Sequence, residues 1–272
     1  MSAGALYMVA SSFVFSVSYS FIKVMTRELG FWEAAFLRGA FGVLLLSAIL
    51  LRTRQPWLGR RENRIPVLAR GFFGGIAMIL YFWSLRSTTL ANASSLHYAH
   101  PLFTVFLAVP ILGERLHWKK VVFVSGAMVG VLFIVQPSPH SIDWGAIPAL
   151  ISAFFASLAY ISIRFVAGRE HWAPIVNSLS LFTLALSAPM AIATWKTPQP
   201  WLWLFIVSAG VGTTFAQYLM TMAYKLQEAS TVAAFSFTSI LWSTIIGVLV
   251  FGEMPGLLEA VGILVLFVCL IM

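Results

Sequence analysis

Long apolar runs, separated by short polar segments, fill the whole chain. Each run is about 18 to 23 residues long, which is the length that an α-helix needs to cross the hydrocarbon core of a membrane. The runs lack the alternation of a barrel strand and are about twice its length, so a closed β-barrel is not expected. The pattern predicts an all-α integral membrane fold with ten transmembrane helices. These helices are expected to begin near Ala3, Phe31, Pro66, Leu90, Lys119, Asp143, Ala173, Trp201, Ala229 and Gly256.

The sequence of the first half returns in altered form in the second half. Residues 91–114 align with residues 230–253 at an offset of 139 positions, and both segments end in Gly-Glu. The first helices of the halves agree at an offset of 141 positions, with the pairs Gly4 and Gly145, Tyr19 and Tyr160, and Ile22 and Ile163. We therefore expect two repeats of five helices each, residues 1–138 and residues 139–272.

Lysine and arginine are unevenly divided between alternate loops. With Arg38 taken as intramembrane, one set of loops carries twelve of these residues and the other set carries four. Positive loops resist translocation, so both termini are expected in the cytoplasm and the chain in the cell inner membrane. The larger set comprises Arg52, Arg54, Arg60, Arg61, Arg64, Arg70, Arg115, Lys119, Lys120, Arg164, Arg169 and Lys225.

An odd number of helices in each half has a topological consequence. The second half must enter the membrane from the face opposite to the first, so the two repeats are predicted to be inverted. Inverted repeats can exchange conformations with each other, and this exchange is the basis of alternating access in many secondary transporters.

Composition agrees with a membrane protein and argues against several functions. Hydrophobic residues make up 60% of the chain, charged residues make up 10%, and the mean hydropathy is +0.91. The net charge of +8 is concentrated in short loops, where it fixes topology, so no nucleic-acid partner is expected. The sequence contains no Walker loop and no Ser-His-acid, Cys-His or metal-ligand constellation. We therefore expect no catalytic site, no ATP hydrolysis, no cofactor and no metal site.

Arg38 is the first candidate for the chemistry, because it lies about two turns into the second predicted helix among apolar neighbours. A charged side chain at membrane depth is costly and usually faces a cavity. The guanidinium group could bind a substrate carboxylate or phosphate through paired N–H donors. The structural alternative is a link from Arg38 to a helix end or to a backbone carbonyl.

The fourth predicted helix carries His97, Tyr98 and His100. The two histidines share one helix face, where they could bind a carboxylate or carry a coupled proton near neutral pH. The alternative is that each is a neutral histidine bonded to a neighbouring helix. Pro101 follows directly and removes a backbone donor, so we expect a kink or hinge at that point.

The corresponding region of the second half lacks these cationic groups. We expect Asn177, Gln217, Tyr218 and Trp242 to form a facing wall of amides and aromatic rings. The cavity would then suit a small solute with a carboxylate and an apolar or cationic remainder. The matched residues Tyr19 and Tyr160 either line the pathway as a symmetric pair or anchor their helices at the membrane interface.

The only matched carboxylates are Glu114 and Glu253, and each lies where an apolar run ends. They are expected to act at helix ends or to close a gate. No Asp or Glu lies within the middle of a predicted span, so coupling of Na⁺ or H⁺ through a carboxylate is not expected. Proton coupling through His97 or His100, exchange, and facilitated efflux remain open.

The paired motif resembles a known family. Residues 85–114 contain Pro-Leu-Phe and Leu-Gly-Glu-Arg, and residues 223–253 end in Phe-Gly-Glu. With ten helices in two halves, the whole chain resembles an EamA-type member of the drug/metabolite transporter superfamily. The chain departs from the pattern at Ile240, which stands where the first half has Pro101, so equal flexing of helices four and nine is not expected.

The resemblance implies a secondary transporter, and not an enzyme. We expect it to export a small carboxylate-bearing metabolite, such as an amino acid or a derivative, and the outward direction rests on the resemblance alone. Alternatives are an importer of a vitamin, nucleoside or methyl donor, an intramembrane lipid-modifying enzyme, and a scaffold or receptor without transport. The expected partners are a small-molecule substrate and the lipid bilayer, and the sequence leaves the formation of a homodimer open.

Overall fold

The computed structural model describes residues 2–97, 99–114, 118–135 and 144–271, and these form helices without a β-strand. The elements of the first half are α1 (Ala3–Glu28), α2 (Phe31–Thr53), the short 3-10 helix η1 (Arg61–Asn63), α3 (Arg64–Ser87), α4 (Leu90–His97), α5 (His100–Leu112) and α6 (Trp118–Val135). Those of the second half are α7 (Ala146–Phe165), α8 (Trp172–Ala193), α9 (Leu202–Leu226), α10 (Ala229–Phe235), α11 (Thr238–Phe251) and α12 (Leu257–Ile271).

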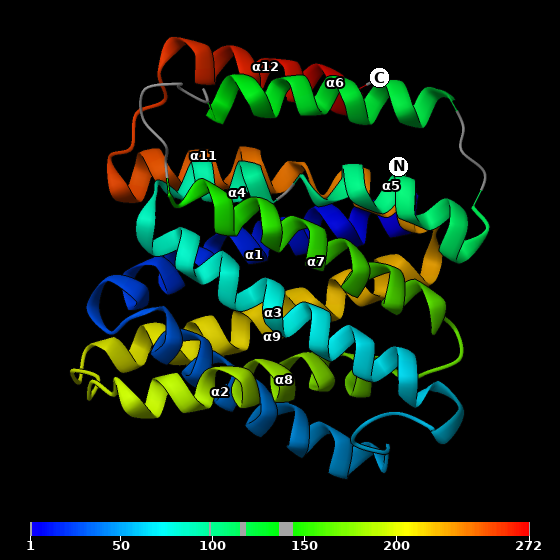
Figure 1. Ribbon diagram of the computed structural model, residues 1–272, viewed down its shortest axis with the longest axis vertical. Helices are drawn as coiled ribbons and strands as arrows, with labels where there is room; N and C mark the ends of the chain where they lie inside the picture. The colour runs from blue at the N-terminus through cyan, green and yellow to red at the C-terminus, as the bar shows by residue number, and fades with distance from the viewer. Residues whose placement is uncertain (1, 98, 115–117, 136–143, 272) are drawn as a thin grey trace.

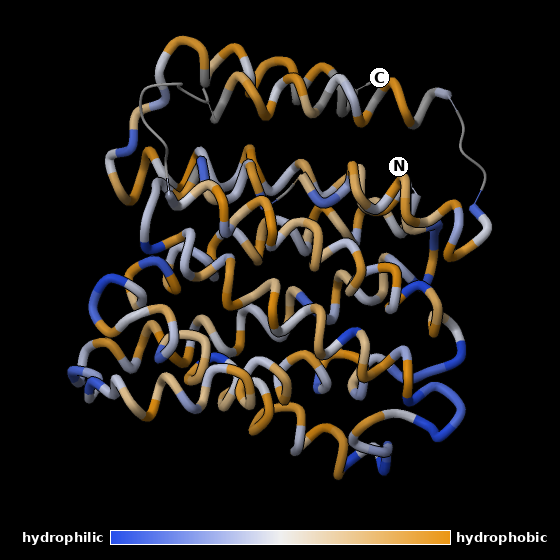
Figure 2. The backbone as a smooth tube through the Cα atoms, viewed as in Figure 1, coloured by the Kyte–Doolittle hydropathy of each residue, from blue (hydrophilic) through white to orange (hydrophobic). Residues whose placement is uncertain are grey.

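Eight segments of the described chain are long and apolar enough to cross a membrane. Six are the single helices α1, α2, α3, α7, α8 and α9, and two are pairs of shorter helices, α4 with α5 and α10 with α11. We call each of these single helices or helix pairs a rod. The helices α6 and α12 pack against each other, and with them each half has five rods. Figure 2 shows hydrophobic residues along the rods and hydrophilic residues where the rods end. The prediction of an all-α membrane fold is confirmed.

The two halves are interlocked and do not form separate bodies. Figure 1 shows tiers stacked along the long axis of the molecule, from α6 with α12 at the top to α2 with α8 at the bottom. Between them, α1 packs along α9 and α7 packs along α3, so the first helix of each half lies on the third helix of the other. This reciprocal packing gathers side chains from both halves at the middle of the molecule.

The ends of the two broken rods show that the fourth rods run in opposite directions. Glu114, just beyond α5, accepts a hydrogen bond from the N–H of Ala229 at 2.8 Å, at the start of α10. Glu253, just beyond α11, accepts one from the N–H of Leu90 at 3.1 Å, at the start of α4. Each broken rod ends beside the beginning of the other, which is the antiparallel arrangement that inverted repeats require. Both carboxylates also lie at the positive end of a helix dipole.

Both fourth rods are interrupted near their middle. Between α4 and α5, the N–H of Ala99 bonds to the carbonyl of Leu96, and Pro101 follows in the first turn of α5. Between α10 and α11, four i to i−3 hydrogen bonds replace the α-helical pattern, although Ile240 stands in place of a proline. The second interruption therefore does not depend on proline, and both rods can bend at matched positions.

The apolar runs predict the helix starts within a few residues, but the predicted count of basic loop residues changes by one. The third helix begins at Arg64, two residues before the predicted Pro66, so Arg70 lies inside α3 by either start, and its side chain is only 2% exposed. Counting Arg70 as a loop residue was therefore wrong, and the twelve basic residues of the larger set become eleven against four. The predicted repeat boundary at residue 138 and the predicted helix start at Asp143 lie outside the described residues.

Candidate functional site

A polar cluster lies at the centre of the bundle, where helices of both halves meet. Arg70 of α3, His97 of α4, Tyr160 of α7 and Gln217 of α9 line one small cavity together with apolar side chains. Its free volume of about 10 Å³ is enough for about one water molecule. The site is therefore contracted in this conformation, and a solute can enter only when the surrounding helices part.

Arg70 is the basic residue of this cavity. Its side chain is 2% exposed, and its Nη2 donates a hydrogen bond of 2.7 Å to the Oε1 of Gln217. The guanidinium carbon lies 5.7 Å from the centre of the Tyr160 ring, and Nε has no hydrogen-bond partner among the described residues. A side chain at Gly74 would collide with Nη1 of Arg70, so glycine at that position leaves room for the guanidinium.

Arg38 reaches the same region from α2. It is 1% exposed, and its Nε donates a hydrogen bond of 3.3 Å to the Oγ1 of Thr213 on α9. Both Nη atoms lack a hydrogen-bond partner among the described residues. The bond from Nε goes to a side-chain hydroxyl and not to a helix end or a backbone carbonyl, and the two Nη groups remain available for a ligand. A buried guanidinium without an acidic partner is an anion-binding group.

The hydrogen bonds of the two histidines show which ring nitrogen of each carries a proton. The hydroxyl of Ser152 donates to the carbonyl of Ala77 at 2.7 Å, so its contact of 2.8 Å with His97 requires Nδ1 of His97 to be the donor. The hydroxyl of Ser236 likewise donates to a backbone carbonyl, so Nε2 of His100 donates to it at 3.1 Å. Both serines belong to the second half, and the histidines therefore connect the two halves.

A row of aromatic rings crosses the site. Consecutive ring centres lie 4.3 to 6.0 Å apart, and the row includes Tyr81 and Tyr224, which the sequence analysis did not single out. Tyr19 and Tyr160 are 2% and 8% exposed, so they are core residues and not interfacial anchors. The row runs through Tyr19, Tyr81, His97, His100, Tyr160 and Tyr224.

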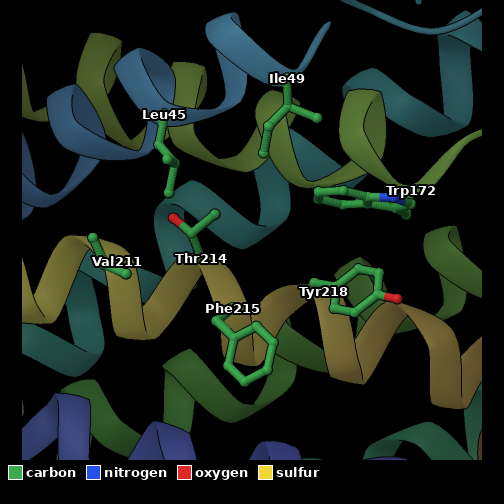
Figure 3. Close-up of a pocket in the computed structure, with 7 residues that line it drawn as sticks. All are labelled: Leu45, Ile49, Trp172, Val211, Thr214, Phe215 and Tyr218. Atoms are coloured by element: carbon green, nitrogen blue, oxygen red, sulfur yellow. The ribbon is translucent and has the colours of Figure 1, made fainter. Parts of the chain in front are cut away.

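Three residues expected to face Arg38 lie elsewhere. Asn177 donates from Nδ2 to the carbonyl of Trp57 at 3.1 Å and so holds the connection after α2. Trp242 packs edge to face on Phe13 at 5.1 Å. Tyr218 lines a separate apolar pocket between α2, α8 and α9, where Figure 3 shows its ring beside Trp172. Tyr98 lies outside the described residues. Of the expected facing wall, only Gln217 reaches the polar cluster.

The two ends of the bundle differ at the matched carboxylates. At one end, Nζ of Lys23 lies 2.5 Å from Oε1 of Glu253, and the ammonium group is fully buried. At the other end, Arg164, which aligns with Lys23 at the offset of 141 positions, donates instead to the carbonyl of Tyr224 at 3.1 Å. A cleft of about 580 Å³ opens there beside Glu114. The Glu253 end is therefore closed by an ion pair, and the Glu114 end is the more open one.

Comparison with known proteins identifies the family of this architecture. The chain matches the model of the EamA-like transporter family over residues 2–136 and 143–272. It is 30% identical to the pseudopaline exporter of Pseudomonas aeruginosa, covering 99% of this chain and 95% of that protein. It is 29% identical to a riboflavin transporter of Rhizobium johnstonii, covering 93% and 84%.

Two further similarities complete the comparison. An S-adenosylmethionine uptake transporter of Rickettsia prowazekii is 25% identical, with 88% of this chain and 82% of that protein covered. A solved crystal structure superimposes with a TM-score of 0.77 over 99% of this chain and 96% of that chain, at 20% identity. The last similarity concerns the fold alone.

Proposed function

The chain belongs to the EamA-like transporter family, and from this premise we propose that it exports a small carboxylate-bearing metabolite, such as an amino acid or a derivative. One observation carries the proposal, namely the buried guanidinium of Arg38 with two Nη atoms that have no partner among the described residues. A solute carboxylate could accept two parallel hydrogen bonds from such a group. Gln217, Tyr160 and His97 would form the rest of the site.

The contracted cavity supports transport by alternating access. A carboxylate-bearing metabolite is larger than the free space beside Arg70, so the site must open to one face and then to the other. The matched interruptions of the fourth rods, including the one before Pro101, provide places where the halves can bend. In the proposed cycle, the Lys23–Glu253 pair closes one end, and an Arg164–Glu114 pair forms when the opposite end closes.

The export direction rests on one line of support. The pseudopaline relative carries the name of an exporter. The excess of basic residues, eleven against four, favours a cytoplasmic location for the open Glu114 end and for both termini. A bacterial inner membrane fits this family of relatives. The second candidate function is import, because another relative is named an uptake transporter. The family assignment favours a transporter over an enzyme.

Solute release from proteoliposomes tests the proposed function. Vesicles loaded with a mixed pool of amino acids and other metabolites would be reconstituted with the wild type, Arg38→Gln or Arg52→Gln, and the released solutes identified by mass spectrometry. Arg52 lies on the same helix but is exposed, so its substitution removes a charge without touching the site. We expect selective release of carboxylate-bearing solutes that Arg38→Gln abolishes and Arg52→Gln retains.

Two outcomes would contradict the proposed function. Release of solutes with no preference for those that carry a carboxylate would contradict the assigned solute class. Release that persists in Arg38→Gln would show that Arg38 does not bind the solute and has a structural role. Direction is tested in cells, where a strain lacking an exporter accumulates its substrate and a strain lacking an importer starves for it.

A further inference from the structure

Arg38 and Arg70 belong to one site, although they come from different helices. Both side chains reach α9, where Arg38 bonds to Thr213 and Arg70 bonds to Gln217. Residues four positions apart lie on one helix face, with Cβ atoms roughly 5 to 6 Å apart. Arg70 lies near enough to Arg38 to act on it electrostatically. The polar cluster therefore contains two positive charges about one helical turn apart.

Among the residues that the structure describes, no acidic side chain balances either charge. The acceptors of the two arginines are a threonine hydroxyl and a glutamine carbonyl, and both are neutral. The ion pair found among the described residues, Lys23 with Glu253, lies at the end of the bundle. Two like charges in a buried site repel each other and each is costly to desolvate, so the empty site is short of two negative charges.

We propose that Arg38 and Arg70 form a paired anion site that takes a solute with two carboxylate groups, one on each guanidinium. The inference rests on the proposed function and narrows its solute class. A solute with one carboxylate would leave the second arginine uncompensated, whereas a short dicarboxylate neutralises both. The planar fork of each guanidinium suits a carboxylate better than a more compact anion.

Gln217 has a defined part in this site. Its Oε1 accepts from Arg70 while the site is empty, and the space at Gly74 lets the guanidinium turn towards a stronger acceptor. A solute carboxylate would displace the neutral amide oxygen. The substitution Gln217→Glu keeps the size of the side chain but supplies an internal carboxylate for Arg70. The protein should then accept the amide analogue, with one carboxylate, in place of the dicarboxylate.

Matched solute pairs test the inference. Proteoliposomes would be loaded with equal amounts of glutamate and glutamine, aspartate and asparagine, and glutarate and butyrate, which differ mainly by one carboxylate. We expect the wild type to release the dicarboxylate of at least one pair about tenfold faster than its partner. In Gln217→Glu and in Arg70→Gln this ratio should fall about tenfold or more, because only Arg38 still needs an anion. Arg52→Gln is the matched control and should keep the wild-type ratio.

Binding gives a second readout that does not need transport. The thermal melting temperature of the purified wild type would be measured with glutarate, succinate, butyrate or inorganic phosphate. Stabilisation by a dicarboxylate beyond that by butyrate, lost in Gln217→Glu, supports the paired site, provided that the variant alone melts at the wild-type temperature or above. A wild type that favours the solutes with one carboxylate, or a ratio unchanged in Gln217→Glu, would overturn it.

The outcomes also separate the inference from the proposed function. Equal release of both members of every pair leaves carboxylate export intact and rejects the paired site. Absence of any release, with stabilisation by a dicarboxylate, rejects export and keeps the paired site. Stabilisation by phosphate equal to that by dicarboxylates would reject the two-carboxylate geometry in favour of one phosphate held between both arginines.

Discussion

His97 and His100 occupy the polar cluster as neutral hydrogen-bond donors towards the second half. Because Ser152 gives its only proton to the carbonyl of Ala77, Nδ1 of His97 carries a proton, and Nε2 is the nitrogen that can take up another. Uptake of that proton would add a third positive charge beside Arg70. Proton binding and binding of a solute anion at this site should therefore favour each other.

This residue-scale argument predicts the pH response of transport. If His97 carries the coupled proton together with the solute anion, a gradient of one pH unit should concentrate the solute about tenfold on the alkaline side at equilibrium. The substitution His97→Gln should abolish this response, whereas His171→Gln, which removes a histidine from the connection before α8, should retain it. Solute gradients in proteoliposomes across an imposed pH gradient measure both. An equal response in all three proteins would exclude His97 as the proton carrier.

The residues of the site were only partly predictable from the sequence. Arg38 and His97 stand out because a charge or imidazole within an apolar run is costly. Arg70 was missed because it lies only four residues beyond the predicted helix start at Pro66, where a basic side chain usually extends to the membrane interface. Its burial depends on packing with the other half, which the sequence does not show. Asn177, Tyr218 and Trp242 were misplaced because hydropathy in a membrane helix does not fix its rotation about its own axis, which depends on packing with its neighbours.

At the scale of the elements, the broken rods and their reciprocal carboxylates form the moving parts of the proposed cycle. Glu114 caps α10 and Glu253 caps α4. Within the described part of the chain, Glu253 alone of the two is also held by a buried basic residue, Lys23. This asymmetry makes the conformation that is closed at the Glu253 end more stable than the conformation that is closed at the Glu114 end. Weakening the ion pair should shift the population towards the state that is open at the Glu253 end.

The substitution Glu253→Gln tests this shift, because it keeps an acceptor for the N–H of Leu90 but removes the charge that holds Lys23. A cysteine introduced at Ser84, one turn before the end of α3, would report opening in a Cys269→Ser background. If the pair contributes about 1.4 kcal/mol to closure, labelling by an impermeant maleimide should become about tenfold faster. Glu114→Gln, the matched change at the other end, should not accelerate it. Equal labelling rates in the wild type, Glu253→Gln and Glu114→Gln would contradict the proposal that the Lys23–Glu253 pair holds this end closed.

The elements themselves were largely predictable, because the lengths of apolar runs fix where a membrane helix can begin. The break before Pro101 follows from the chemistry of proline. The matched break before Thr238 carries no such signal, because residues 230–253 read as one apolar span and Ile240 is an ordinary helical residue. Its cause lies in packing against the other half, where Ser236 bonds to His100.

On the scale of the whole molecule, interlocked inverted halves predict a definite orientation. Figure 1 places both termini towards the same end of the rods. The charge count predicts that this end is cytoplasmic, so a fluorescent protein fused to either terminus should fold and fluoresce in the cytoplasm. Alkaline phosphatase fused after Thr197, between α8 and α9, should be active outside. Active phosphatase at the C-terminus, with none after Thr197, would reverse the orientation and with it the assignment of the open end.

The most direct test of the central claim measures stability and transport on one variant. A structural arginine stabilises the fold, whereas a buried arginine kept for a solute destabilises the empty protein. Even a buried ion pair can often be replaced by apolar residues of similar volume without loss of stability, and an unpaired buried charge has less to lose. For Arg38→Met we therefore predict loss of solute release with a melting temperature equal to that of the wild type or higher. Retained release, or a melting temperature lowered by several degrees, would contradict the account.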